Sequence, residues 1–206
     1  MRQRILGALI LVYMKKLLAI VAIVLTTSTM SAQEDSKFTV NAGVGLSSVV
    51  GSDAEDVKNV FSYKVGLSYD WGLSESFSII PGVQFATKGF KSEAIDGDVS
   101  MSYLQIPILA AYKFGLTEGM KLVVKAGPYV SYGLFGSDIE WYNGSETNVF
   151  DSDGGYERFD AGLIGGVDLD FEHFTVGVEY SHGLTKLDSD YKQYNQAFGV
   201  TFGYKF

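Results

Sequence analysis

The stretch AFGVTFGYKF, residues 197–206, decides the fold. Large apolar side chains occur at every second position, and small or polar ones lie between them. The large ones are Phe198, Val200, Phe202, Tyr204 and Phe206. A period of two is typical of a β-strand whose two faces meet different surroundings. The rest of the chain has to show which of the two faces is in contact with water.

Seven more segments alternate in the same way, and no helical period is sustained after residue 37. We expect strands at 38–47, 60–71, 77–88, 101–114, 121–133, 158–170, 174–184 and 194–206. The connections at 72–76, 115–120 and 171–173 are short, and those at 48–59, 89–100 and 134–157 are long. Tight turns that alternate with long loops predict an all-β fold, an eight-stranded antiparallel up-and-down barrel with two different ends.

The face opposite the large side chains distinguishes a soluble barrel from a membrane barrel. In segment 60–71, Ser62, Lys64 and Gly66 alternate with the large residues, and glycine is frequent on this face of most segments. Glycine weakens strands and brings no benefit on a solvated surface, whereas the narrow inside of an eight-stranded barrel needs small residues. Aromatic residues near the strand ends are typical of the two membrane interfaces. They are Tyr69, Trp71, Tyr112, Tyr132, Tyr180 and Tyr204. We therefore expect a transmembrane β-barrel whose large side chains all face lipid.

The N-terminal region predicts export from the cytoplasm. Lys15 and Lys16 precede the apolar run LLAIVAIVL (17–25) and a small-residue stretch, which is typical of a secretory signal peptide over 1–32. Met14 is a plausible true start, and residues 33–206 would form the barrel domain. An uncleaved anchor is the alternative, and the two lysines make it costly. We expect Sec-type export to the periplasm and residence in the outer membrane.

Composition excludes several function classes. The chain has no cysteine, so it has no disulfides, no thiolate metal site and no lipid-modified cysteine. Its formal net charge is −8, and the predicted signal peptide holds four basic residues and no acid, so the remainder is more acidic still. Such a balance argues against a nucleic-acid partner.

Six stretches resemble the outer-membrane β-barrel family of Bacteroidetes that includes PorT-like proteins. They are PGVQFATKGF (81–90), YLQIPILAAYKF (103–114), VVKAGPYVSYGL (123–134), RFDAGLIGGVDLDF (158–171), EYSHGLTKL (179–187) and FGVTFGYKF (198–206). The resemblance implies an eight-stranded barrel in the outer membrane. It also implies that prolines are tolerated at Pro81, Pro107 and Pro128, where we expect bulges near a rim to accommodate them. Most relatives have no assigned activity, and PorT itself serves protein secretion, so a transport or secretion-accessory role is an alternative function.

Charged residues on the inward face suggest a network in the lumen. Lys64, Lys125 and Lys205 are opposed by Asp160, Asp168 and Glu179. These residues could line a narrow solute or ion pore, or they could pair with one another and fill the barrel. Because the bore of an eight-stranded barrel is closed by side chains, we favour the paired arrangement.

The sequence gives little support for catalysis or for a cofactor. Ser181 and His182, with Glu179 nearby, could suggest a hydrolase, but adjacent residues of a strand point to opposite faces. The stretch DSDGG (151–155) begins like a calcium loop but lacks the later ligands and the final glutamate of an EF-hand. We therefore expect no enzymatic activity, no metal and no cofactor.

The long connections are acidic and predict a cell-surface role. In 134–157, Trp141, Tyr142, Phe150 and Tyr156 occur among acids, and exposed aromatic residues often anchor protein interfaces. We expect a structural or surface-interaction protein, a monomer, in contact with outer-membrane lipid, lipopolysaccharide and an unknown protein ligand. Phe206 resembles the terminal aromatic signal that the outer-membrane assembly machinery selects.

Overall fold

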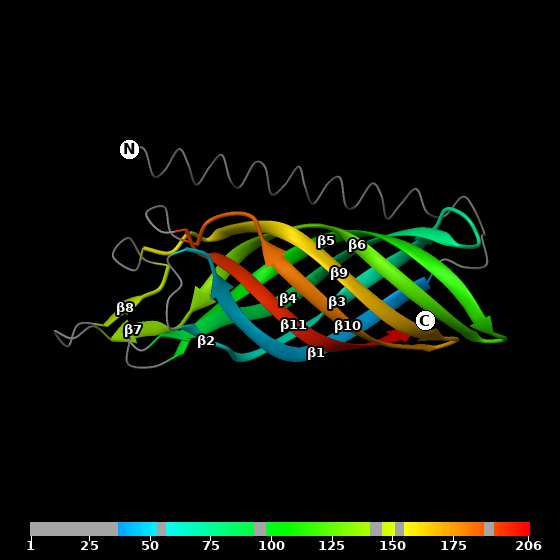
Figure 1. Ribbon diagram of the computed structural model, residues 1–206, viewed down its shortest axis with the longest axis horizontal. Coiled ribbons are helices and arrows are strands. Elements are labelled where there is room, and N and C mark those ends of the chain that lie inside the picture. Colours follow the sequence, from blue (N-terminus) through cyan, green and yellow to red (C-terminus); the bar gives the residue numbers. More distant parts are fainter. Residues whose placement is uncertain (1–36, 53–56, 93–97, 141–145, 151–154, 188–191) are drawn as a thin grey trace. The chain divides into compact units, whose positions relative to one another are not determined.

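The computed structural model describes residues 37–52, 57–92, 98–140, 146–150, 155–187 and 192–206, which form an antiparallel β-barrel (Figure 1). Its eight long strands are β1 (Lys37–Val50), β3 (Val60–Gly72), β4 (Phe77–Ser92), β5 (Asp98–Thr117), β6 (Met120–Gly136), β9 (Phe159–Phe171), β10 (Phe174–Gly183) and β11 (Tyr194–Lys205). Within these ranges, no helix has the length and apolar character needed to cross a membrane. The predicted signal peptide, 1–32, lies outside the described residues.

The sheet closes on itself through its first and last strands. β1 pairs with β11 from Thr39 opposite Lys205 to Val50 opposite Tyr194, which is the full length of β11. The remaining neighbours follow the chain, and β4 pairs with β5 to complete the ring. The predicted all-β, eight-stranded antiparallel barrel is therefore confirmed.

Four strands extend into the predicted long connections. β1 continues into 48–59, and β4, β5 and β6 continue into 89–100 and 134–157. The short β2 (Val57–Lys58) also lies in 48–59 and pairs with the end of β4. A hairpin of β7 (Asp138–Glu140) and β8 (Glu146–Asn148) also lies in 134–157. The prediction of loops across these ranges is wrong in part. The strand ends rise above the apolar band of the outer surface, so their two faces no longer differ in a regular way.

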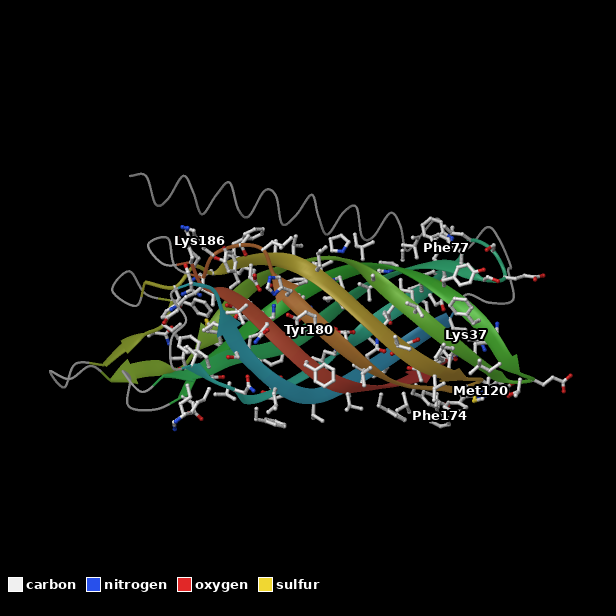
Figure 2. The ribbon with its side chains drawn as sticks, in the orientation of Figure 1. Lys37, Phe77, Met120, Phe174, Tyr180 and Lys186 are labelled. Carbon is white, nitrogen blue, oxygen red and sulfur yellow. The ribbon has the colours of Figure 1, made fainter. Side chains whose placement is uncertain are left out.

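The two ends of the barrel differ, as predicted. The short turns after β3, β5 and β9 lie at the end that also carries Lys37 and the C-terminus, which we call the turn end. Figure 2 shows Lys37, Phe77, Met120 and Phe174 at this end and Lys186 at the opposite one, the loop end. In the turn between β5 and β6, Gly119 has a φ of +79°, a conformation that favours glycine.

The outer surface is apolar and the inside is polar, the reverse of a water-soluble barrel. Along β1 and β11, the outward residues Val44 and Val200 are about half exposed, at 55% and 51%, whereas the inward Thr39 and Thr201 are buried. Aromatic pairs mark the turn end of this surface, with ring centroids 4.8 Å apart for Phe38 and Tyr69. A continuous apolar surface of this size would cause aggregation in water and is stable only against lipid.

The three prolines lie inside strands without shifting the register, so the expectation of bulges is wrong. The β4–β5 ladder is interrupted after Pro81, and the β5–β6 ladder is interrupted next to Pro107 and at Pro128. Beyond each interruption the register resumes unchanged, because proline removes one donor without adding a residue. The two register shifts of the β5–β6 pair lie elsewhere, at Ser102/Tyr103 and Gly115/Thr117.

A charge on the outer surface provides a direct test of this arrangement. We predict that Val200→Lys destabilises the barrel in lipid vesicles by about 2–4 kcal/mol, because the ammonium would lie near the middle of the membrane. Urea unfolding followed by tryptophan fluorescence measures the change, and Val200→Leu is the matched control. Equal stability of the two variants would contradict the outward position of this face.

Candidate functional site

Strand β9 runs the length of the barrel, and its inward carboxylates meet a different lysine at each level. From the turn end upward, Asp170 pairs with Lys205, Asp168 with Lys125, and Asp160 with Lys88. These three pairs, with the partners described below, form what we call the ion-pair stack. Its members come from strands on all sides of the barrel, so the stack crosses the lumen.

At the middle level four charged groups form one network. The Lys125 ammonium lies 2.6 Å from Asp168 Oδ2 and 3.8 Å from Glu179 Oε2. Glu179 also binds Lys64 across the barrel. Four of the six charged residues predicted for the lumen are thus brought together here. The other two, Lys205 and Asp160, belong to the levels below and above.

At the turn end the charges line an open cavity. Lys113 lies 2.8 Å from Asp70, and Lys205 binds Asp170. These residues border a cavity of about 360 Å³ that Lys37, Lys121, Phe171, Glu172 and Gly119 also line. The lowest pairs of the stack therefore border a cavity that is open at this end.

The upper level is the most deeply buried. Lys88 and Asp160 lie 2.8 Å apart, and each side chain is 3% exposed. Asp160 also accepts hydrogen bonds from the Tyr129 hydroxyl at 3.0 Å, the Thr185 hydroxyl at 3.0 Å and the Asn195 amide at 3.2 Å. The Lys88 ammonium lies 4.2 Å from the centre of the Tyr129 ring. This carboxylate and this ammonium are well satisfied, as a buried pair requires.

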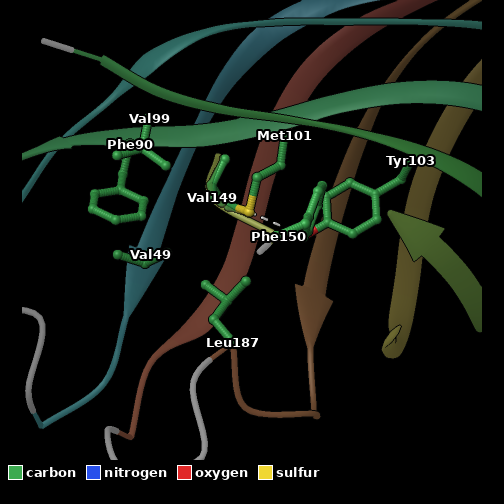
Figure 3. Close-up of a cluster of buried hydrophobic side chains, with 8 residues drawn as sticks. All are labelled: Val49, Phe90, Val99, Met101, Tyr103, Val149, Phe150 and Leu187. Atoms are coloured by element: carbon green, nitrogen blue, oxygen red, sulfur yellow. Dashed lines mark hydrogen bonds between the residues drawn. The ribbon is translucent and has the colours of Figure 1, made fainter. Parts of the chain in front are cut away.

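Above this pair an apolar cluster fills the loop end of the barrel (Figure 3). This loop-end cluster consists of Val49, Phe90, Val99, Met101, Tyr103, Val149, Phe150 and Leu187. Its side chains are 7% exposed or less. Tyr103 connects the cluster to the level below, because its ring lies 5.3 Å from the Lys88 ammonium.

Phe150 reaches the cluster from the long segment between β6 and β9. Its ring meets the Tyr103 ring edge-on, with centroids 6.0 Å apart, and the Arg158 guanidinium lies 4.9 Å from its centre. Gly133 leaves the space for the ring, since a Cβ at that position would lie 2.4 Å from it. Arg158 is fixed in turn by the carbonyls of Gly133 and Leu134.

The aromatic residues predicted to face a partner do not all lie at the surface. Phe150 is buried, and Tyr156 packs against the same cluster, so the prediction that these two are exposed is wrong. Both side chains help to close the mouth of the barrel. Packing there removes more of their apolar surface from water than an exposed position in the loop would. Trp141 and Tyr142 lie outside the described residues, and Phe206 is exposed next to Tyr204, with ring centroids 4.9 Å apart.

The expectation that every large side chain faces lipid is also wrong. Leu109, Tyr129 and Ile164 are buried inside the barrel, with Ile80 packed against them. Gly162 on β9 makes room for the Tyr129 ring, since a Cβ at that position would lie 2.8 Å from it. An apolar group that excludes water from one side of the lumen strengthens the ion pairs beside it.

Between the middle and upper levels a small cavity remains. It measures about 50 Å³ and is lined by Lys64, Glu179, Lys88, Gln105 and Ser181, among others. Gln105 is buried, and its side-chain oxygen has no hydrogen-bond partner in the described part of the chain. A cavity of this size, with several polar groups in its wall, has room for ordered water.

Ser181 and His182 point to opposite faces of β10. Ser181 is buried in the lumen, whereas His182 lies on the outer face beside the rings of Tyr180 and Tyr194. The Glu179 carboxylate faces the lumen and forms ion pairs with Lys64 and Lys125. Across the described ranges, no group of three or more His, Cys, Asp or Glu side chains is arranged to hold a metal.

A closed antiparallel barrel that is apolar outside and charged inside is a membrane β-barrel. The chain belongs to the outer membrane protein beta-barrel domain family, whose model matches residues 31–189. This membership supports residence in the outer membrane. No curated protein matches the chain.

Solved structures with the same fold include several outer-membrane proteins. Neisserial surface protein A is 14% identical with a TM-score of 0.52, over 82% of this chain and 97% of that one. The outer membrane enzyme PagL is 17% identical with a TM-score of 0.52, over 80% and 97%. Ail of Yersinia pestis, solved with the heparin analogue sucrose octasulfate, is 16% identical with a TM-score of 0.45, over 83% and 99%. At these identities the likeness concerns the fold alone.

The upper ion pair yields a prediction with a matched control. Lys88→Met leaves Asp160 buried without its cation, and we expect a loss of about 3–5 kcal/mol in urea unfolding. The double variant Lys88→Met/Asp160→Asn should regain much of this loss. Lys91 and Asp98 form a pair whose side chains are 52% and 58% exposed, so Lys91→Met should cost less than about 1 kcal/mol. Equal losses for Lys88→Met and Lys91→Met would disprove the structural role of the upper level.

Proposed function

We propose that this protein is a closed outer-membrane barrel that acts at the cell surface, in a structural or surface-interaction role, without catalysis. The observation that carries the proposal is the filling of the lumen. The ion-pair stack occupies three levels of the barrel, and the loop-end cluster covers the uppermost pair. A barrel filled in this way interacts with other molecules through its outer surface and its extracellular segments, and not through its lumen.

A narrow solute or ion pore is less well supported than a closed barrel. In the described part of the chain, the stack pairs five lysines with five carboxylates, so few charges are left to attract an ion. They are Lys64, Lys88, Lys113, Lys125 and Lys205, with Asp70, Asp160, Asp168, Asp170 and Glu179. Opening such a lumen would require several buried pairs to separate, at a cost of several kcal/mol each.

Catalysis is also poorly supported by the side chains that could perform it. His182 and Ser181 are separated by the sheet itself, and Glu179 is engaged by Lys64 and Lys125. The likeness to the enzyme PagL concerns the fold and carries no catalytic residues to this chain.

A transport or secretion-accessory role of the PorT-like kind is the second candidate. The observation that favours it is the charged cavity of about 360 Å³ at the turn end, which a periplasmic partner could enter. Co-purification of a periplasmic or inner-membrane complex with the detergent-solubilised barrel would favour this role. A partner captured only through Trp141 and Tyr142 would favour the surface role.

Because the chain has no cysteine, single cysteines can report which end is displayed. We predict that Lys186→Cys, at the loop end, reacts with a membrane-impermeant maleimide on intact cells. Glu118→Cys, in the exposed turn between β5 and β6, should react only after the outer membrane is opened. Reaction of Glu118→Cys on intact cells, or protection of Lys186→Cys there, would refute surface display of the loop end.

A further inference from the structure

We infer that the charged cavity at the turn end binds a small ligand with a carboxylate beside an N–H donor, namely an amino acid or the carboxyl-terminal end of a peptide. The ammonium groups of Lys37 and Lys121 and the carboxylate of Glu172 would hold it, and all three residues line the cavity. The inference goes beyond the proposed surface role, which concerns the loop end. It rests on that role only for the compartment, because display of the loop end outside the cell places the turn end in the periplasm.

Lysines outnumber carboxylates around this cavity, and two of them are left without an acidic partner. Lys37 lies opposite Asp70 in the β1–β3 ladder, and Lys121 lies opposite Asp170 in the β6–β9 ladder. Residues that face each other across a ladder are close enough to pair. Both carboxylates instead bind lysines of other strands, β5 and β11. Lys37 and Lys121 therefore keep their charges without a carboxylate partner in the described part of the chain.

The two ammonium groups belong to the cavity and not to the lipid-facing surface. Lys37 lies on the same face of β1 as the buried Thr39, so its side chain is directed inward. Lys121 lies on the same face of β6 as the buried Val123. Both lysines are half-buried, and the Lys37 ammonium lies 3.4 Å from the backbone carbonyl of Glu172. A partly desolvated ammonium without a counter-ion gains more from an added carboxylate than a fully hydrated one does.

The acids of the lining favour a single carboxylate over a more highly charged anion. Glu172 is exposed, and across the described ranges its carboxylate forms no ion pair. A doubly charged anion, such as inorganic phosphate, would be repelled by this carboxylate. A ligand carboxylate can bind the two lysines, while an N–H group beside it donates to Glu172. Amino acids and peptide ends carry these two groups side by side.

The size and the construction of the cavity suit such a ligand. Its volume of about 360 Å³ lies at the lower end of the range for small-molecule sites, roughly 300–1,000 Å³. Phe171 adds an apolar side chain to the wall, and Gly119 adds no side chain that would narrow it. Because Lys37 and Lys121 take no part in the ion-pair stack, a ligand can bind them without separating any of its pairs.

The test measures peptide binding to the refolded full-length barrel in detergent micelles by fluorescence anisotropy. The probe is an alanine tripeptide with a fluorescent label at its amino end and a free carboxyl end, and the same peptide with a carboxyl-terminal amide is the matched ligand control. The variant is Lys37→Gln/Lys121→Gln. Lys186→Gln/Lys192→Gln removes the same charge from exposed positions of the loop end and is the matched protein control. Heat-modifiable gel migration checks that each variant is folded.

We expect wild-type protein and Lys186→Gln/Lys192→Gln to bind the free-acid peptide with affinities within about twofold of each other. Lys37→Gln/Lys121→Gln should bind it at least about tenfold more weakly, as the loss of charge-assisted hydrogen bonds implies, and the amidated peptide should show a similar loss with wild-type protein. Displacement of the probe by free alanine would identify an amino acid as the ligand, and displacement by the unlabelled tripeptide alone would identify a peptide end. Either result supports the inference.

Three outcomes would overturn the inference. They are an affinity of Lys37→Gln/Lys121→Gln within about twofold of wild type, equal binding of the amidated and free-acid peptides, and displacement of the probe by inorganic phosphate as readily as by the tripeptide. Each would leave the proposed surface role in place, because binding in micelles does not depend on which end of the barrel is displayed. The cysteine-labelling experiment tests that display separately.

Discussion

A charge inside a closed barrel in a membrane has to find an opposite charge, and this requirement organises the whole interior. A lone ammonium or carboxylate there would lose its hydration, and no ion pair or hydrogen bond would compensate for that desolvation penalty. Strand β9 meets the requirement three times, at Asp170, Asp168 and Asp160, each with a lysine from another strand. Since a slip of one residue would turn these carboxylates toward lipid, the pairs also fix the register of the sheet.

The same constraint explains why the two ends of the barrel differ. At the turn end the lowest pairs border an open cavity, where water can share the solvation of the charges. At the loop end Lys88 and Asp160 are covered by apolar side chains, and the Tyr129 and Thr185 hydroxyls donate hydrogen bonds to Asp160. Phe150 completes this cover from a distant segment, so the closure is tertiary rather than a property of the strands. This asymmetry is the physical basis for proposing a surface role in place of a passage.

Much of the fold could be predicted from the sequence, because a period of two is a local property of each strand. The same period assigns Asp70, Lys113 and Asp170 to the inside, although the predicted network omitted them. Lys88 was harder to identify, because it stands at the end of the predicted strand and its pairing depends on how far β4 continues. Phe150 gives no local sign of burial, since its surroundings are acidic and its contacts come from β5, β6 and Arg158. Pairings and mouth closure depend on long-range contacts, which a single sequence does not display.

Current through the refolded full-length barrel in a planar lipid bilayer tests the closure of the lumen most directly. We predict no steady, discrete conductance at moderate voltage and neutral pH, because three levels of paired charges and an apolar cluster lie in the path. A large-bore porin measured in the same bilayer would verify the sensitivity of the recording. Steady, discrete conductance steps that depend on the presence of this protein would contradict a closed lumen.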